Sequence, residues 1–188
     1  MDTAGKALAP GTLVTVRRAD ESALGVAMFN PHSLVAARVL DRDAGRVIGR
    51  RFFARRLERA LRLRDQLFDL PYYRLVHAEA DGLPGLVVDR FAGVLVVQFN
   101  AAGIARFEPQ VLEALDVLLA PEAIVLRNDS PARTLEGLML ETQVAKGTVG
   151  GPVVVCENGV EFLADPLAGQ KTGWFLSLIH ISEPTRPY

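Results

Sequence analysis

Residues 74–91, RLVHAEADGLPGLVVDRF, decide how the second half of this 188-residue chain folds. Two apolar runs, residues 74–79 and 86–89, flank the segment 81–85, which contains two glycines and a proline. Gly and Pro at such a junction are typical of tight turns because they adopt the backbone angles that a turn needs. The stretch therefore predicts two neighbouring strands joined by a tight loop.

The segments after this stretch continue an α+β pattern. Residues 94–99 and 123–127 are predicted strands, and residues 106–119 form a predicted amphipathic helix between them. Because a single helix joins these two strands, we expect them to lie side by side. Residues 153–156 and 160–164 flank Asn158-Gly159, the strongest hairpin signal in the chain.

The segments before this stretch predict short strands and then a helix. Residues 12–17, 23–29 and 34–41 are separated by Asn, Asp, Gly and Pro, which indicates a small barrel or sandwich. From residue 50 to 68 the apolar period becomes helical. Arg64 falls in the middle of the apolar stripe, where a guanidinium group must either extend to solvent or pair with a carboxylate. Glu79 and Asp81 are its candidate partners.

Charge is distributed unevenly over the chain, although the net charge is only −1. Residues 1–74 carry 14 Lys and Arg against 8 Asp and Glu, and the second half is acidic. Eight arginines lie between residues 46 and 64, opposed only by Glu58. Arginine suits phosphate contacts and base stacking. We therefore assign RNA binding to the face formed by Arg51, Arg55, Arg59 and Arg62; the alternative is a solvated helix face in an arginine-rich proteome.

Several other site classes find little support in the sequence. The single cysteine, Cys156, closes no intrachain disulfide, which indicates a reducing, cytoplasmic compartment. Its alternating strand context predicts a packed thiol rather than a nucleophile. The histidines are scattered, so we expect no metal site, and no catalytic constellation is predicted. Residues 147–151 are a predicted connecting loop, and no segment is apolar enough to predict a membrane span.

Several ordered motifs match one known family. Residues 74–91 resemble the central-domain signature of RlmI-type methyltransferases, and the segment with Asn30-Pro31-His-Ser33 is similar to that family's N-terminal PUA domain. The other matching residues are Gly25, Arg38, Arg127-Asn-Asp, Arg133, Glu136-Gly-Leu138, Glu157-Asn-Gly159, Asp165 and the segment 169–176. The resemblance implies an S-adenosylmethionine-dependent enzyme that methylates cytosine C5 in large-subunit ribosomal RNA, with a PUA pseudobarrel that binds RNA.

The resemblance also implies where a cofactor would bind. In the family, the segment that matches residues 169–176 opens a Rossmann-like domain with the cofactor site and a nucleophilic cysteine. The residues that border this site by resemblance are Gln170, Lys171, Thr172, Gly173 and Phe175. The match stops at Leu176, and residues 177–188 resemble a translated sequencing adapter. Residues 1–10 lack the family's first strand, so we expect the pseudobarrel to be incomplete.

These observations predict an α+β chain whose Rossmann-like methyltransferase domain is missing. A PUA-like RNA-binding unit with a basic helix is expected over residues 1–70 and a central α+β domain over 71–168. Residues 169–176 would begin the methyltransferase domain, and 177–188 would be an artefactual tail.

The predicted function is that of a fragment of an rRNA methyltransferase that binds ribosomal RNA, is inactive alone and does not bind S-adenosylmethionine. The alternatives are a stand-alone PUA-type RNA-binding or adaptor protein and an intact protein whose acidic half binds a protein partner.

Overall fold

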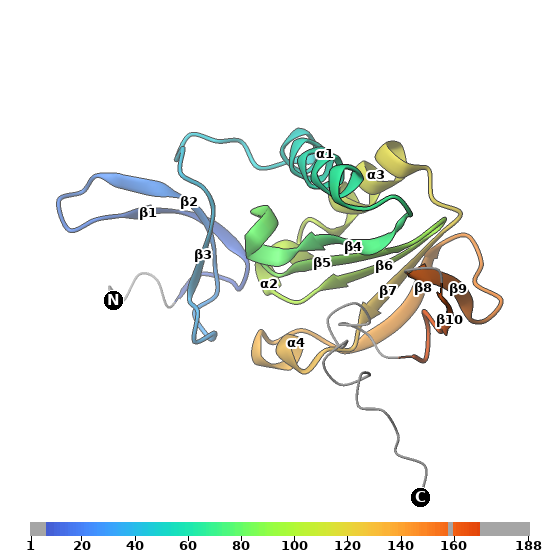
Figure 1. The fold of residues 1–188 in the computed structure, drawn as a ribbon. Coiled ribbons are helices and arrows are strands. Elements are labelled where there is room, and N and C mark those ends of the chain that lie inside the picture. The colour runs from blue at the N-terminus through green and yellow to red at the C-terminus, as the bar shows by residue number, and fades with distance from the viewer. Residues whose placement is uncertain (1–6, 158–159, 170–188) are drawn as a thin grey trace, which may run out of the picture.

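The computed structural model describes residues 7–157 and 160–169, and its N-terminal strands form one small sheet. Strands β1 (Thr12–Arg17), β2 (Ala23–Phe29) and β3 (Ala37–Asp41) pair antiparallel in the order β1-β2-β3 (Figure 1). Gly25 allows β2 and β3 to approach closely, because its φ is +145° and a Cβ there would lie 2.2 Å from the Asp41 carbonyl oxygen.

This sheet corrects the expected barrel or sandwich. The first two strands have their predicted bounds, but the three described strands form an open sheet rather than a pseudobarrel. The third strand begins at Ala37 instead of residue 34. The reason is a turn in which the Asn30 N–H donates to the Ala36 carbonyl at 2.8 Å, so residues 31–35 loop out of the ladder.

A second sheet forms the centre of the molecule. Strands β4 (Tyr72–His77), β5 (Leu86–Phe91), β6 (Val94–Phe99), β7 (Ala123–Asn128) and β8 (Glu141–Lys146) lie in chain order. All neighbours are antiparallel except β6 and β7, which are parallel and joined through α2 (Ala102–Ala105) and α3 (Glu108–Leu119). The expectation that these two strands are neighbours is confirmed. The 3-10 helix η2 (Ala78–Asp81) and α4 (Pro131–Leu135) were not predicted.

The two faces of this sheet pack against different elements, helices on one side and a hairpin on the other. Helices α1 (Arg50–Leu67) and α3 cover one face, where Leu95 and Val97 of β6 join the main core (Figure 1). Val96, between them in sequence, points to the other face because side chains alternate along a strand. It packs there with Val155 from the hairpin of β9 (Val153–Glu157) and β10 (Val160–Ala164), whose register confirms the predicted hairpin.

Helix α1 packs on α3 and the second sheet, and Arg56 also joins it to the N-terminal sheet by donating to the Leu40 carbonyl. Phe53 and Leu57 are fully buried, and the Phe53 ring lies 5.1 Å from that of Phe107. The apolar stripe of the helix is therefore satisfied by α3 and β4. The placement leaves the arginine face of α1 pointing away from the core.

The predicted partner of Arg64 is confirmed. The Arg64 guanidinium donates to both Asp81 carboxylate oxygens, at 2.7 and 2.8 Å, and its Nε donates to the Arg74 carbonyl at 3.0 Å. Only 11% of the Arg64 side chain and 8% of the Asp81 side chain are exposed. This ion pair fixes the end of α1 against the loop between β4 and β5.

Removing one member of this pair should strongly destabilise the fold. The Asp81→Ala variant should lose about 3–5 kcal/mol of unfolding free energy in urea, because Arg64 would remain buried and unpaired. The control Glu79→Ala removes a carboxylate that is 60% exposed and should cost less than about 1 kcal/mol. Similar losses of unfolding free energy in Asp81→Ala and Glu79→Ala would contradict the assignment of Asp81 as the partner of Arg64.

Candidate nucleic-acid interface

The four arginines assigned to RNA binding lie together on the outer face of α1. Arg51, Arg55 and Arg59 are exposed, and they make no ion pair or hydrogen bond with any residue that the structure describes. Arg62 is exposed too, but its guanidinium lies 3.3 Å from the Glu58 carboxylate. Successive arginines four residues apart rise by about 6 Å along a helix. The face therefore offers positive charges in a row.

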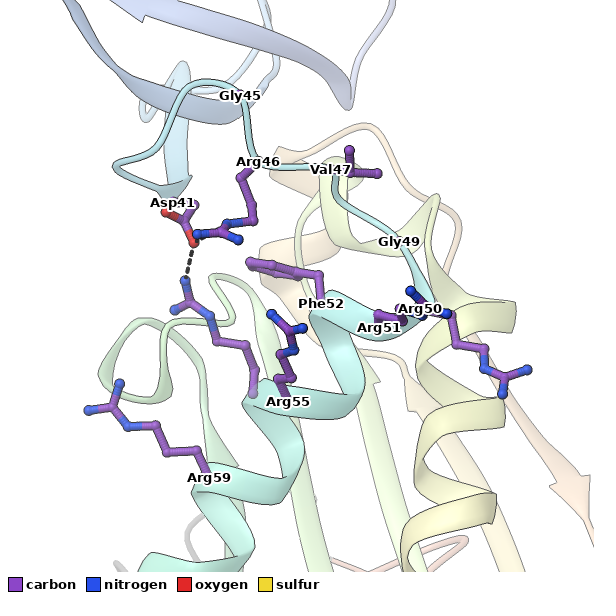
Figure 2. A pocket seen from close by; sticks show the side chains of 11 residues that line it. Asp41, Gly45, Arg46, Val47, Gly49, Arg50, Arg51, Phe52, Arg55 and Arg59 are labelled. Atoms are coloured by element: carbon purple, nitrogen blue, oxygen red, sulfur yellow. Dashed lines mark hydrogen bonds and ion pairs between the residues drawn. The ribbon is translucent and has the colours of Figure 1, made fainter.

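A hollow of about 840 Å³ lies where this face meets the connection between β3 and α1 (Figure 2). Its other lining residues are Asp41, Gly45, Val47, Gly49 and Phe52, and its arginines are Arg46, Arg50, Arg51, Arg55, Arg56 and Arg59. The hollow thus combines residues from the end of the N-terminal sheet with residues from α1. Among the residues that the structure describes, Asp41 is the only carboxylate that lines it.

Asp41 fixes one wall of the hollow. Its carboxylate lies 3.2 Å from Arg56 and 3.5 Å from Arg46, and the Asp43 N–H donates to it at 2.9 Å. The Asp43 N–H and the two guanidinium groups hold the pKa of Asp41 below its ordinary value of 3.8, against the opposing effect of burial. Arg56 also donates to the Leu40 carbonyl at 2.8 Å. These contacts give Arg56 a structural role that the sequence analysis missed.

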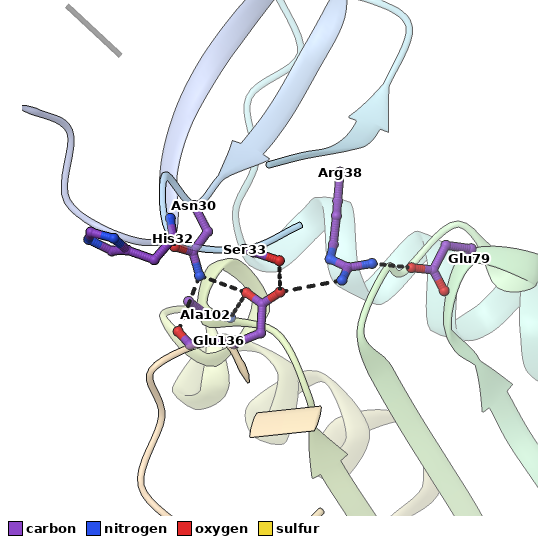
Figure 3. A network of polar contacts seen from close by, with 7 residues as sticks. All are labelled: Asn30, His32, Ser33, Arg38, Glu79, Ala102 and Glu136. Atoms are coloured by element: carbon purple, nitrogen blue, oxygen red, sulfur yellow. Dashed lines mark hydrogen bonds and ion pairs between the residues drawn. The ribbon is translucent and has the colours of Figure 1, made fainter. Parts of the chain in front are cut away.

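A second polar network joins the N-terminal sheet to the second sheet (Figure 3). The buried Glu136 carboxylate accepts from Asn30 Nδ2 at 2.9 Å, Ser33 Oγ at 2.8 Å and Arg38 at 3.3 Å. The Ala102 N–H donates to it at 3.2 Å. The turn between β2 and β3 is therefore held against α2 and the residue that follows α4.

Burial raises the pKa of Glu136, but the bonds from Asn30, Ser33, Ala102 and Arg38 outweigh it. The pKa of Glu136 consequently lies below its ordinary value of 4.5, and the carboxylate is charged at neutral pH.

Arg133 lies three residues before Glu136 but turns to the other side, where it donates to the Phe99 carbonyl and, at 3.0 Å, to the Met139 carbonyl. Ser130 caps α4, because its hydroxyl accepts from the Ala132 N–H. Glu136 thus finds its partners more than 30 residues away, which sequence spacing does not reveal.

The other site classes that the sequence analysis considered concern Cys156, metal ligands, a membrane span and the residues assigned to the cofactor. Cys156 is a half-buried free thiol on β9. Within residues 7–157 and 160–169, no three His, Cys, Asp or Glu side chains gather as metal ligands. In the same part of the chain, no helix combines the length and apolar composition that a bilayer span requires. Gln170, Lys171, Thr172, Gly173 and Phe175, and the tail 177–188, lie outside the described residues.

Comparison with known proteins identifies the sequence family. A model of the PUA-like domain family matches residues 1–42. A ribosomal RNA large subunit methyltransferase I from Pseudoalteromonas translucida is 38% identical over 174 residues, which cover 88% of this chain and 43% of that protein. Its counterpart from Cronobacter sakazakii is 36% identical over 98% of this chain and 47% of its own length. Over most of its own length, the chain is similar to proteins of the ribosomal RNA large subunit methyltransferase I family. It spans about half the length of these relatives.

Solved structures correct the predicted fold class. A Streptococcus mutans protein assigned as an SAM-dependent methyltransferase superposes with a TM-score of 0.76 at 13% identity, over 92% of this chain and 45% of that one. A second, SMU.776 complexed with SAH, matches over 92% and 44% with the same TM-score. The expectation that the methyltransferase fold is missing is therefore wrong. That expectation placed the methyltransferase fold only after Leu176. The fold that the chain shares with these two structures includes the five-stranded sheet of β4 to β8.

The described hollow does not fit S-adenosylmethionine itself. The cofactor carries a positive sulfonium centre, and the hollow is lined by six arginines against one carboxylate. Its charge favours an anion instead. The residues assigned to the cofactor by resemblance remain a prediction.

The Glu136 network should make stability depend on pH. A carboxylate with a lowered pKa stabilises the fold above its unfolded pKa, and this contribution is lost as pH falls through the folded pKa. Glu136→Gln should therefore cost about 1.5–3 kcal/mol of unfolding free energy at pH 7. The difference from the parent protein should shrink as pH falls below the ordinary value of 4.5.

Urea unfolding between pH 7 and 3 measures this difference. The exposed Glu122→Gln is the matched control and should follow the parent protein throughout. A difference between parent and Glu136→Gln that stays constant over this range would refute the network's role.

Proposed function

We propose that this chain binds large-subunit ribosomal RNA through Arg51, Arg55, Arg59 and Arg62, in the service of an S-adenosylmethionine-dependent methylation of cytosine C5. The observation that carries this proposal is the row of exposed guanidinium groups on α1, of which three have no carboxylate partner among the described residues. Unpaired guanidinium groups bind phosphate through paired, charge-assisted hydrogen bonds. The family relationship and the PUA-like domain match support RNA as the source of that phosphate.

Backbone contacts of this kind supply affinity and position rather than sequence choice. The row on α1 therefore orients an RNA strand, and selection of the target cytosine belongs to other contacts. The same face continues into the hollow at the start of α1, which is lined by α1, by the connection before it and by Asp41 at the end of β3. This arrangement makes the placement of the N-terminal sheet against α1 part of the RNA-binding surface.

We further propose that the chain transfers no methyl group and binds no S-adenosylmethionine by itself. Methylation at cytosine C5 requires a cysteine thiolate that attacks the base. The only cysteine, Cys156, lies on β9, opposite Glu161 in the hairpin, and it does not line the arginine hollow. RNA binding is thus the activity that we assign to the described residues.

RNA affinity should depend steeply on salt. Four phosphate contacts with single-stranded RNA predict that log K falls with log salt at a slope of about −3. Arg55→Gln should reduce that slope by about 0.7, because it removes one contact. Arg17→Gln removes another exposed arginine, on β1 and away from this face, and is the control. Fluorescence anisotropy at several salt concentrations gives the slopes; a slope near zero would refute the assignment.

Cofactor titration tests the proposal on methylation. Calorimetry with the purified chain should show no heat from S-adenosylmethionine beyond dilution, with or without RNA. A saturable binding isotherm, or methylated RNA formed by the chain alone, would show that the chain carries the catalytic chemistry as well.

A further inference from the structure

The arginine hollow has an uncharged side that phosphate binding leaves unused. Gly45, Val47, Gly49 and Phe52 line it together with the arginines, and Val47 is 84% exposed. Figure 2 shows Val47 on the connection above the helix and the Phe52 ring projecting toward Arg46. Phe52 is only 7% exposed and the Arg56 guanidinium lies over its ring, 4.8 Å from the centroid, so the exposed apolar surface here is mainly that of Val47. An exposed apolar side chain in a hollow suits a flat apolar partner.

The arginines of the hollow fall into two groups with different freedom. Arg46 is held by Asp41 at 3.5 Å and Asp43 at 3.3 Å, so its guanidinium plane is fixed in place. Arg51 and Arg55 have no partner in the part of the chain that the structure describes and are free to bind an anion. A guanidinium with its edge engaged by carboxylates still offers a face for stacking on a base.

The size of the hollow exceeds what one phosphate group needs. Its volume of about 840 Å³ lies within the range of sites that enclose small organic ligands. Cationic and apolar surfaces therefore meet in one concavity. A nucleotide presents the complementary combination, with an anionic phosphate at one end and a flat base at the other.

We propose that this hollow receives one unpaired nucleotide of an RNA strand. Its phosphate binds Arg51 and Arg55, and its base packs against Val47 and the guanidinium plane of Arg46. Bases in a duplex are stacked on both faces and do not enter such a hollow, so the site selects single-stranded RNA. This inference rests on the proposed RNA binding and adds the class of RNA that the face recognises.

The test compares an intact single-stranded oligonucleotide with an abasic strand of the same length and charge. Fluorescence anisotropy with the full chain should show binding of the abasic strand weakened by at least about fivefold, because base stacking is lost. The salt slope should be the same for both strands, because their phosphates are the same. A duplex of the same length should also bind more weakly than the intact single strand.

Two valine variants locate the base contact. Val47→Ala should bring the ratio of the two affinities close to one, while Val117→Ala, which changes a valine that is 75% exposed on α3, should leave it unchanged. Equal binding of intact and abasic strands by the parent protein would overturn the nucleotide site but leave phosphate binding intact. A ratio unaffected by Val47→Ala would place the base elsewhere. Failure of both strands to bind would overturn the proposed function itself.

Discussion

A single buried carboxylate, Glu136, determines how the two sheets of this protein are placed. Burying an ionised carboxylate is costly unless donors surround it. Here Asn30, Ser33 and Arg38 donate from the N-terminal sheet and its turn, and Ala102 donates from the second sheet's side. The network is satisfied only when both parts are in place, so it selects one arrangement.

The arginine face depends on that arrangement. Once the turn between β2 and β3 is fixed, β3 delivers Asp41 to the start of α1, where it holds Arg46 and Arg56. Arg46 and Arg56 would otherwise add unpaired positive charge, but Asp41 holds them in one wall of the hollow. Asp81 pairs with Arg64 in the same way. Arg74 pairs with the buried Asp89, and burial raises the pKa of Asp89 despite this ion pair. Counting arginines therefore overstates the charge available to RNA.

Much of the local structure follows from the sequence, because it depends on periodicity and turn residues. The bounds of β1, β2, β6 and β10 and the partner of Arg64 were predictable in this way. Strand β8 was missed because its side chains are exposed on both faces and show no alternation. The packing of α1 on β4 and α3 could not be derived from the sequence, because an apolar stripe does not state which sheet covers it. The Glu136 network joins residues 106 positions apart, a distance that no spacing rule reaches.

The central claim is that RNA lies along α1 and in the hollow at its start, where Asp41 of the N-terminal sheet also contributes. The most direct measurement is a mass-spectrometric map of photocrosslinks between the full chain and single-stranded RNA that carries 4-thiouridine. The account predicts that crosslinked peptides concentrate between residues 45 and 62. Crosslinks confined to the β1–β2 hairpin or to the β9–β10 hairpin would contradict it.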